Sequence, residues 1–192
     1  VVAGINYEKF LTFENSKDIE GFTIKYREDP IFLDPRLKKL GARLIINLEK
    51  LYLSLKKLEL KIAKVEDYYN LSHNLGISQI DNLNLQNKIF GIECNFEELN
   101  GIDFKKGCYV GQENTARIKL KNKLNKKLFA IQIIEGNIIN EEIFLKDKQV
   151  GKLLIKNKNP FALIKIENNQ LDFESVYQCG NAKIRVLKPD WL

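Results

Sequence analysis

The eight residues KGCYVGQE, at positions 106–113, place a cysteine between two glycines. Gly107 and Gly111 allow backbone angles that other residues rarely adopt, and they let the backbone approach a ligand closely. Lys106 puts positive charge near the thiol of Cys108, which favours the reactive thiolate form. By itself this pattern fits two structures equally well: a reactive, ligand-facing turn, and a glycine-rich turn around a buried structural cysteine.

The remaining side chains of this run suit contact with a heterocyclic ligand. Tyr109 offers an aromatic face for stacking. Gln112 and Glu113 supply an amide and a carboxylate, and hydrogen bonds to a carboxylate are among the stronger kinds.

The composition excludes several classes of protein. Among the 192 residues, 44% hydrophobic and 29% charged residues are typical of an ordinary globular protein. No apolar run approaches the ~18–20 residues that cross a bilayer, so we expect no membrane partner. The net charge of +6 comes mainly from lysine, with five arginines. Nucleic-acid sites combine clustered Arg with stacking aromatics, so we expect no nucleic-acid partner and interpret the lysine run at 119–127 as a solvated hairpin.

Cysteine spacing and residue usage predict the compartment. The three cysteines form no CxxC pair, which argues against a disulfide framework or a zinc site and favours a reducing compartment. Frequent Lys, Ile and Asn are typical of an AT-rich genome. We therefore predict a bacterial cytoplasmic protein, with the mitochondrial matrix as the less favoured alternative.

Hydrophobic periodicity divides the chain near residue 115. Residues 22–47 alternate as two strands around a turn, and 48–75 have helical spacing with a break near 63–67. Residues 78–104 indicate a long connection of the kind that is often functional. The second half has short strands separated by turns, which indicates a small barrel or sandwich. These strands are expected at 116–120, 127–134, 142–145, 151–155, 161–166 and 183–187.

Several segments together resemble one family. KGCYVGQE resembles the signature of the YgfZ-type folate-binding and iron–sulfur cluster assembly proteins, in the superfamily of the glycine-cleavage T protein. The lead-in at 93–102, the TAR at 115–117, the DPR…LGAR element at 34–43 and the final PDWL at 189–192 are similar to the same family. Members carry a longer stretch before DPR, so this chain is expected to lack their N-terminal portion.

The resemblance implies both a fold and a function. The expected fold is α+β, with the ferredoxin-like α/β portion of a T-protein-type folate-binding fold in residues 1–115 and a small C-terminal β-barrel in 116–192. The implied cofactor is tetrahydrofolate or a one-carbon derivative, and the implied partners are iron–sulfur client enzymes or assembly proteins. The expected function is an accessory role in the assembly or repair of iron–sulfur enzymes. The alternative is an aminomethyltransferase of the glycine cleavage system, so whether the chain is an enzyme stays open.

The resemblance also assigns candidate site residues. Cys108 is the catalytic candidate, with three alternatives: a nucleophile or redox thiol, a ligand of a transient cluster, or a structural residue. No resident metal is expected. The cofactor-binding candidates are Lys106, Gly107, Tyr109, Gly111, Gln112, Glu113, Glu93 and Arg117.

Five further residues carry weaker expectations. Arg36 and Arg43 suit either the glutamate tail of a folate or structural salt bridges. His73 stands near a position where family members often have an arginine, and it replaces that charge in part or serves as a surface or capping residue. Cys94 and Cys179 are expected to be small core residues, because free cysteine is among the most buried residue types.

Overall fold

The computed structural model of this chain describes residues 2–79, 85–107, 110, 112–120, 125–166 and 171–192. The chain divides into two compact units, Val1–Asp67 and Tyr68–Leu192. Each unit has a hydrophobic core of its own. The domain boundary predicted between residues 115 and 116 stays a prediction.

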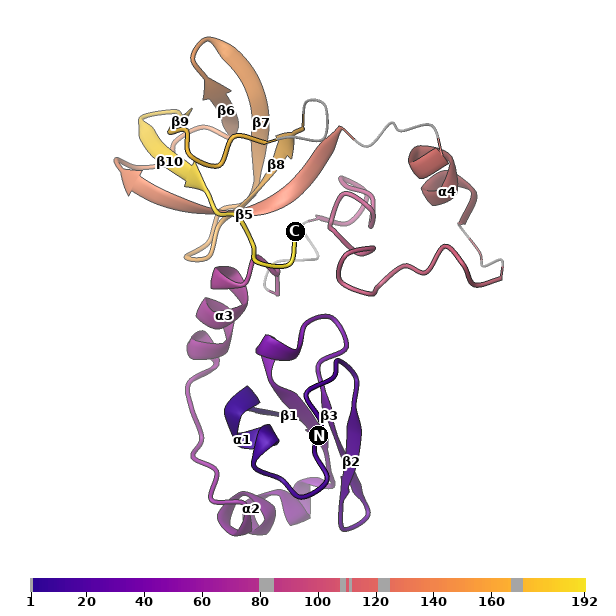
Figure 1. The fold of residues 1–192 in the computed structure, drawn as a ribbon. Helices are drawn as coiled ribbons and strands as arrows, with labels where there is room; N and C mark the ends of the chain where they lie inside the picture. Colours follow the sequence, from indigo (N-terminus) through magenta and orange to yellow (C-terminus); the bar gives the residue numbers. More distant parts are fainter. Residues whose placement is uncertain (1, 80–84, 108–109, 111, 121–124, 167–170) are drawn as a thin grey trace. The chain divides into compact units, whose positions relative to one another are not determined.

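The first unit is built on a four-stranded antiparallel sheet (Figure 1). Its elements are β1 (Val2–Ile5), α1 (Tyr7–Leu11), β2 (Thr23–Tyr26), β3 (Asp29–Leu33), the 3-10 helix η1 (Lys38–Leu40), β4 (Ala42–Ile45) and α2 (Leu48–Lys57). The strand order is β1-β4-β3-β2, and all pairs are antiparallel.

One face of this sheet forms the core of the first unit. Successive side chains of a strand point to opposite faces, so Ile31 and Leu33 of β3 and Leu44 of β4 all lie on the covered side and are fully buried. Phe10 of α1 joins them, and Leu51 of α2 packs at the edge of the same core. Burying a side chain of this size contributes about 1.5–3 kcal/mol, so the hydrophobic pattern fixes which face of the sheet is inside.

The second unit contains a closed six-stranded barrel (Figure 1). Its strands are β5 (Lys126–Glu135), β6 (Glu142–Leu145), β7 (Lys148–Ile155), β8 (Phe161–Lys165), β9 (Tyr177–Cys179) and β10 (Ala182–Val186). They close in the order β10-β5-β8-β7-β6-β9, with antiparallel pairing throughout. Ile131, Ile143, Ile164 and Ile184 are fully buried inside the barrel.

The helix α3 (Val65–Asn74) ends in a glycine cap that also binds the end of the chain. Gly76 has a φ of +73°, its amide donates to the carbonyl of His73, and the next amide donates to that of Ser72. This is the pattern of a helix terminated by a left-handed glycine. The indole Nε1 of Trp191 donates to the carbonyl of Leu75 over 2.7 Å, which fixes the PDWL ending against this cap.

The predicted α+β fold with a C-terminal barrel is confirmed. The expected two helices occur, but the break between α2 and α3 lies at residues 58–64 and begins earlier than the predicted 63–67. Five of the six strands expected after residue 115 occur. The strand predicted at 116–120 is wrong, because these residues form the second half of the helix α4 (Gln112–Leu120). Residues 22–47 form three strands, β2, β3 and β4, where two were expected, because the Asp29-Pro30 interpreted as a turn begins β3. The short strands β1 and β9 were not predicted either; each has only three or four residues, too few to show a period.

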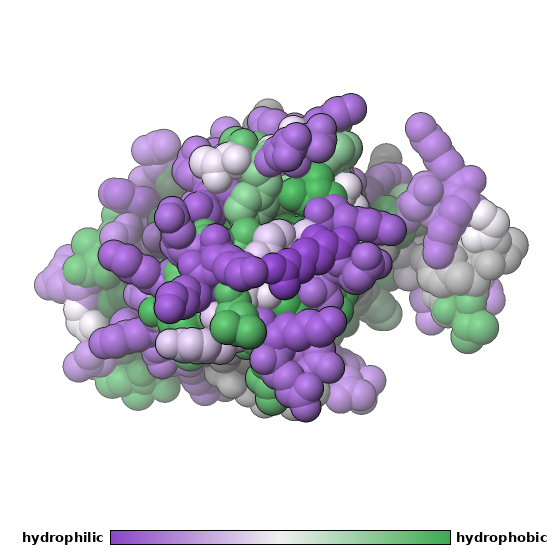
Figure 2. Space-filling model, turned by 90° about the horizontal axis from the view of Figure 1, so that it is seen from below, coloured by the Kyte–Doolittle hydropathy of each residue, from purple (hydrophilic) through white to green (hydrophobic). Residues whose placement is uncertain are grey.

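The surface is dominated by polar side chains, with separate hydrophobic patches between them on the face that Figure 2 shows. The more exposed apolar residues include Leu48, Tyr52 and Leu53 of α2. Across the described ranges, no helix has the length and apolar character that crossing a bilayer requires.

Candidate ligand site around the 106–117 motif

The structure describes five of the nine predicted site residues with their side chains. Cys108, Tyr109, Gly111 and the side chain of Gln112 lie outside the described residues, so their predicted roles stay predictions. The other five are Lys106, Gly107, Glu113, Arg117 and Glu93.

Gly107 lies in open space. Among the described residues, no atom comes within 4 Å of the position that a Cβ would take on this glycine, and its φ is outside the left-handed range. Neither packing nor backbone conformation in this part of the chain therefore requires a glycine here. Space beside the backbone is what close approach of a ligand would need.

Glu113 and Arg117 bind each other on α4. The guanidinium of Arg117 donates to the carboxylate of Glu113 over 2.6 Å, across one helical turn. Both side chains are more than half exposed. Pairs at this spacing stabilise a helix by only ~0.2–0.5 kcal/mol, so both groups can exchange partners at little cost.

Glu93 ties the connection before the motif to the barrel. Its carboxylate accepts from the amide of Phe90 over 2.9 Å, and its backbone carbonyl accepts from the amide of Leu128 over 2.8 Å. In this structure its carboxylate therefore caps a turn.

The turns at 91–100 carry buried polar atoms without hydrogen-bond partners. Asn95 is 2% exposed, and its Nδ2 donates to the carbonyl of Leu128 over 2.8 Å. One oxygen of Glu98 pairs with the buried ammonium of Lys127. Among the described residues, the Oδ1 atom of Asn95 and the second carboxylate oxygen, Oε2 of Glu98, have no hydrogen-bond partner. Buried acceptors without donors are costly, so these two atoms mark a place where a donor is missing.

A pocket of about 410 Å³ lies directly before the motif. Carboxylates, an amide and an aromatic ring line it. The residues are Glu97, Asn100, Ile102, Asp103, Phe104 and Lys105.

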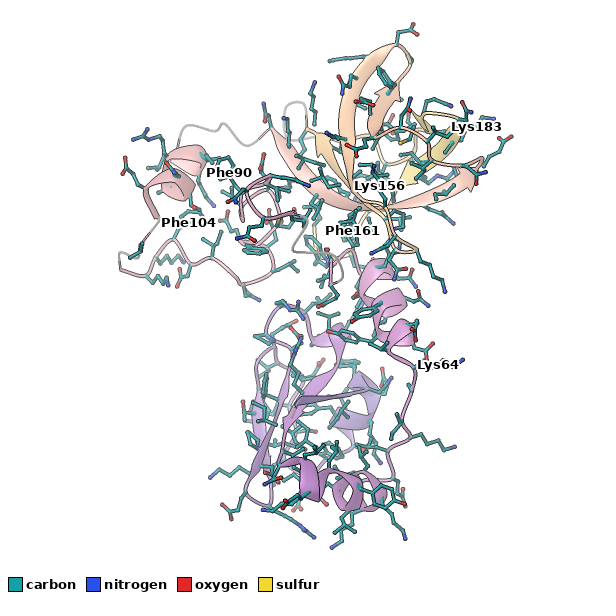
Figure 3. The ribbon with its side chains drawn as sticks, turned by 180° about the vertical axis from the view of Figure 1, so that it is seen from behind. Lys64, Phe90, Phe104, Lys156, Phe161 and Lys183 are labelled. Carbon is teal, nitrogen blue, oxygen red and sulfur yellow. The ribbon has the colours of Figure 1, made fainter. Side chains whose placement is uncertain are left out.

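One side chain of α4, that of Lys119, contacts two residues that line this pocket. The ammonium of Lys119 pairs with the carboxylate of Glu97 and lies 4.6 Å from the centre of the Phe104 ring. Figure 3 labels Phe104 on the segment beside α4. A larger groove of about 900 Å³ on the barrel is lined by none of the predicted site residues.

The DPR element is a structural cluster in the first unit. Asp34 is almost fully buried, and its carboxylate accepts from Arg36 over 2.8 and 2.9 Å and from Arg43 over 2.8 and 3.0 Å. Burial acts to raise the pKa of Asp34, but the hydrogen bonds from the two arginines outweigh it and the pKa is lowered. A Cβ on Gly41 would lie 2.2 Å from the carbonyl oxygen of Ile5, so the same element needs its glycine.

His73 is buried in the second unit. Its Nε2 lies 3.1 Å from the carbonyl oxygen of Pro160, and its ring meets the ring of Phe161 edge-on, with 5.3 Å between centroids. Burial lowers the pKa of His73 below 6.5, although the carbonyls of Pro160 and Ile131 act to raise it. The ring is therefore neutral near pH 7, and the expectation that it replaces a missing positive charge is wrong.

Two cysteines are packed into the structure. Cys179 is fully buried in the barrel core, and Cys94 is half-buried beside the cluster around Leu85 and Leu128. Burial, and secondarily the charge of Glu93, raises the pKa of Cys94 to about 11, so this thiol is unreactive near pH 7. Among the residues with described positions, no group of three or more His, Cys, Asp or Glu side chains is placed to hold a metal ion.

Known proteins resemble this chain over most of its length. A mitochondrial iron–sulfur cluster assembly factor, an IBA57 homolog of Dictyostelium discoideum, is 29% identical over 148 residues, which is 74% of this chain and 36% of that protein. The mitochondrial assembly factor IBA57 of Mus musculus is 29% identical over 115 residues, 60% of this chain and 30% of that protein. No family model matches the chain.

A bacterial protein matches a shorter stretch more closely. The tRNA-modifying protein YgfZ of Buchnera aphidicola subsp. Baizongia pistaciae is 56% identical over 43 residues, 22% of this chain and 13% of that protein. Over these stretches the chain is similar to proteins of the YgfZ/IBA57 type. It spans about a third of the length of the two IBA57 proteins.

The predicted bacterial cytoplasmic location is wrong. The relatives matched over the longest stretches are named as mitochondrial proteins of eukaryotes, which points to the mitochondrion. The prediction failed because frequent Lys, Ile and Asn reflect the base composition of a genome, and base composition does not specify a compartment.

Sequence reasoning missed the residues that build the pocket. Glu97, Phe104 and Lys119 were not assigned to a site, and neither were Asn95 and Glu98, which carry the unpartnered acceptors. The available signal was the position of the first two in the long connection just before the motif. No pattern within the sequence indicates that Lys119 meets both of them.

Proposed function

We propose that this chain is part of a tetrahydrofolate-binding accessory protein that supports assembly or repair of iron–sulfur cluster enzymes in mitochondria. The observation that carries the proposal is the KGCYVGQE run at 106–113 within a 148-residue match to a protein named as a mitochondrial iron–sulfur cluster assembly factor. The match covers 36% of that assembly factor, so the activity of the whole protein is part of what we propose for this chain.

The described residues fit a folate. The pterin ring of tetrahydrofolate presents an amino group and a ring N–H, which are hydrogen-bond donors. The pocket before the motif offers the acceptors Glu97, Asn100 and Asp103, and an aromatic face at Phe104. Pockets for ligands of this kind have volumes of ~300–1,000 Å³, a range that includes this one.

The positive charges near the motif suit the other end of the same cofactor. Lys105 lines the pocket, and Lys106 follows it as an exposed side chain. Their charges would attract the glutamate carboxylates of a folate. When bound, tetrahydrofolate supplies the capacity to carry one-carbon units, while the residues named here bind and orient it.

Calorimetric titration of tetrahydrofolate into the protein tests the cofactor. We expect saturable binding to the wild type and about 3- to 10-fold weaker binding to Phe104→Leu, because stacking on an aromatic ring is worth ~0.5–1.5 kcal/mol. Phe144→Leu, a matched change on β6 outside the pocket, should bind like the wild type. Absence of binding to the wild type would remove folate from the proposal.

Cells that lack the gene test the biological role. Activities of mitochondrial [4Fe–4S] enzymes should fall, and the wild-type gene should restore them. If Cys108→Ala binds tetrahydrofolate normally but fails to restore these activities, then Cys108 has a chemical role. Normal cluster-enzyme activities in the deletion strain, together with turnover of lipoyl carrier protein and tetrahydrofolate in vitro, would favour the aminomethyltransferase instead.

A further inference from the structure

Two residues that line the pocket, Glu97 and Phe104, already contact a side chain of the same molecule. Lys119 places an ammonium, with three N–H donors, against the carboxylate of Glu97 and over the ring of Phe104. Both partners line the 410 Å³ pocket. Glu97 and Phe104 therefore already bind a group that donates hydrogen bonds to a carboxylate while it covers an aromatic face.

We propose that Glu97 and Phe104 form the subsite for the N–H-donor edge of the folate ring, and that Lys119 fills this subsite until the ligand displaces it. This inference rests on the proposed function for the identity of the ligand. The ring edge presents the same donors as the ammonium of Lys119, and its flat face suits Phe104 better than a tetrahedral ammonium does.

The shape of the pocket wall is fixed before any ligand arrives. Asn95 and Asn100 have φ values of 62° and 58°, in the left-handed region, and a Cβ on Gly101 would lie 3.1 Å from the carbonyl oxygen of Phe96. The amides of Gly101 and Ile102 both donate to that same carbonyl. A wall held in this way presents Glu97 and Phe104 in one arrangement, so Lys119 and the ligand compete for the same atoms.

The contact of Lys119 is weak enough to be exchanged. Its side chain is 43% exposed and that of Glu97 is 34% exposed, and ion pairs and cation–π contacts at exposed sites contribute little. α4 buries no described side chain fully, and its other ion pair joins Glu113 to Arg117 within the helix. Lys119 is therefore the main described anchor of α4 to the pocket.

Displacing Lys119 has a consequence for the motif. α4 begins at Gln112, so the helix that Lys119 anchors carries the end of KGCYVGQE together with Arg117. Binding at the subsite would free this helix and release Glu113 and Arg117 for contact with the rest of the ligand. The free protein then has a lower apparent affinity, because only the fraction with an empty subsite can bind.

The test compares Lys119→Gln with Lys119→Arg and with Lys156→Gln as a matched control. Lys156→Gln removes another lysine–glutamate pair, in which Lys156 binds the carboxylate of Glu141 just before β6. Figure 3 labels Lys156. Hydrogen exchange of the amides of residues 112–120 should be several-fold faster in Lys119→Gln and unchanged in the other two variants, because arginine also pairs with a carboxylate and covers an aromatic ring. Tetrahydrofolate should bind Lys119→Gln about 3- to 10-fold more tightly than the wild type.

Two results would overturn the subsite. One is unchanged exchange of residues 112–120 in Lys119→Gln. The other is unchanged or weaker binding of tetrahydrofolate by that variant while the wild type binds it. If no variant binds tetrahydrofolate, the proposed function fails, and the exchange comparison still decides whether Lys119 anchors α4. Phe104→Leu separates the two roles of the ring: it should speed exchange as Lys119→Gln does, but weaken binding.

Discussion

Asp34 illustrates how a residue in a recognisable motif can have a structural role. Its carboxylate accepts hydrogen bonds from two guanidinium groups, and their positive charges compensate its buried negative charge. Arg36 lies two residues from Asp34 in the chain and Arg43 lies nine residues away, and the antiparallel pairing of β3 with β4 brings Arg43 to the same carboxylate. Of the two roles predicted for these arginines, salt bridging is the one that the structure contains.

Replacing Asp34 with Asn should destabilise the first unit by about 2–4 kcal/mol, since removing one partner leaves buried or half-buried charges uncompensated. Because the folded state lowers the pKa of Asp34 below 3.8, its contribution is complete above pH 3.8 and is lost as pH falls through the lower, folded-state pKa. Urea unfolding from pH 7 to pH 2 should therefore show the difference between wild type and Asp34→Asn shrinking only in strong acid.

Asp18 supplies the control for this experiment. Its carboxylate accepts from Lys38 over 2.8 Å, but this pair is exposed to solvent. Asp18→Asn should therefore cost far less than Asp34→Asn, and added salt should reduce that cost further. Equal losses in the two variants would contradict the structural role assigned to Asp34.

At the scale of elements, α4 shows where periodicity misleads. In residues 116–120, apolar and charged side chains alternate, which is the pattern of a strand. Five residues are too few to separate a period of 2 from one of 3.6, and the good helix formers Gln112, Glu113 and Ala116 favour a helix over the longer segment. Five barrel strands were predictable as short apolar segments separated by turn residues, and β10 also alternates between buried and exposed positions. The contact of Lys119 with Glu97 was not predictable, because it joins residues 22 positions apart.

The lysines around α4 correct a second expectation at this scale. The run at 119–127 was interpreted as a solvated hairpin. In the described residues, Lys119 pairs with Glu97 and the buried Lys127 pairs with Glu98, so two of these charges are used within the fold. A charge run in a sequence does not reveal which of its members fold back onto acidic partners.

The helix α3 should make stability depend on pH through His73. Burial holds the pKa of this ring below 6.5, so the unfolded state takes up a proton more readily. Stability is therefore unaffected above pH 6.5 and falls as pH decreases from 6.5 toward the folded-state pKa. Between pH 8 and pH 5, wild type should lose more unfolding free energy than His73→Phe, which keeps an aromatic ring beside Phe161. An equal loss in both proteins would contradict this prediction, because it would mean that unfolding does not change the protonation of His73 between pH 8 and pH 5.

At the scale of the whole molecule, the two units have separate hydrophobic cores. All buried members of the first core lie between Ile5 and Ile46, and all those of the barrel core lie between Phe129 and Val186. A third cluster joins Leu85 to Leu128, so the connection before the motif packs with residues of the barrel strands. Composition and periodicity predicted the change from α/β to β, but they could not show which core the connection joins, because it lacks a regular period.

Because the two cores are separate, a cavity in one core should destabilise only the unit that contains it. Ile164→Ala in the barrel and Leu33→Ala in the sheet each remove a fully buried side chain, at a cost of about 2–5 kcal/mol. Hydrogen exchange should become faster in β5–β10 for Ile164→Ala and in β1–β4 for Leu33→Ala, with the other unit unchanged, because stability is local to each cooperative unit. Residues 85–107 should respond with the barrel, through Leu85 and Cys94. Faster exchange throughout the chain in either variant would instead mean that the two units unfold as one, and the proposed ligand site would then depend on the stability of both.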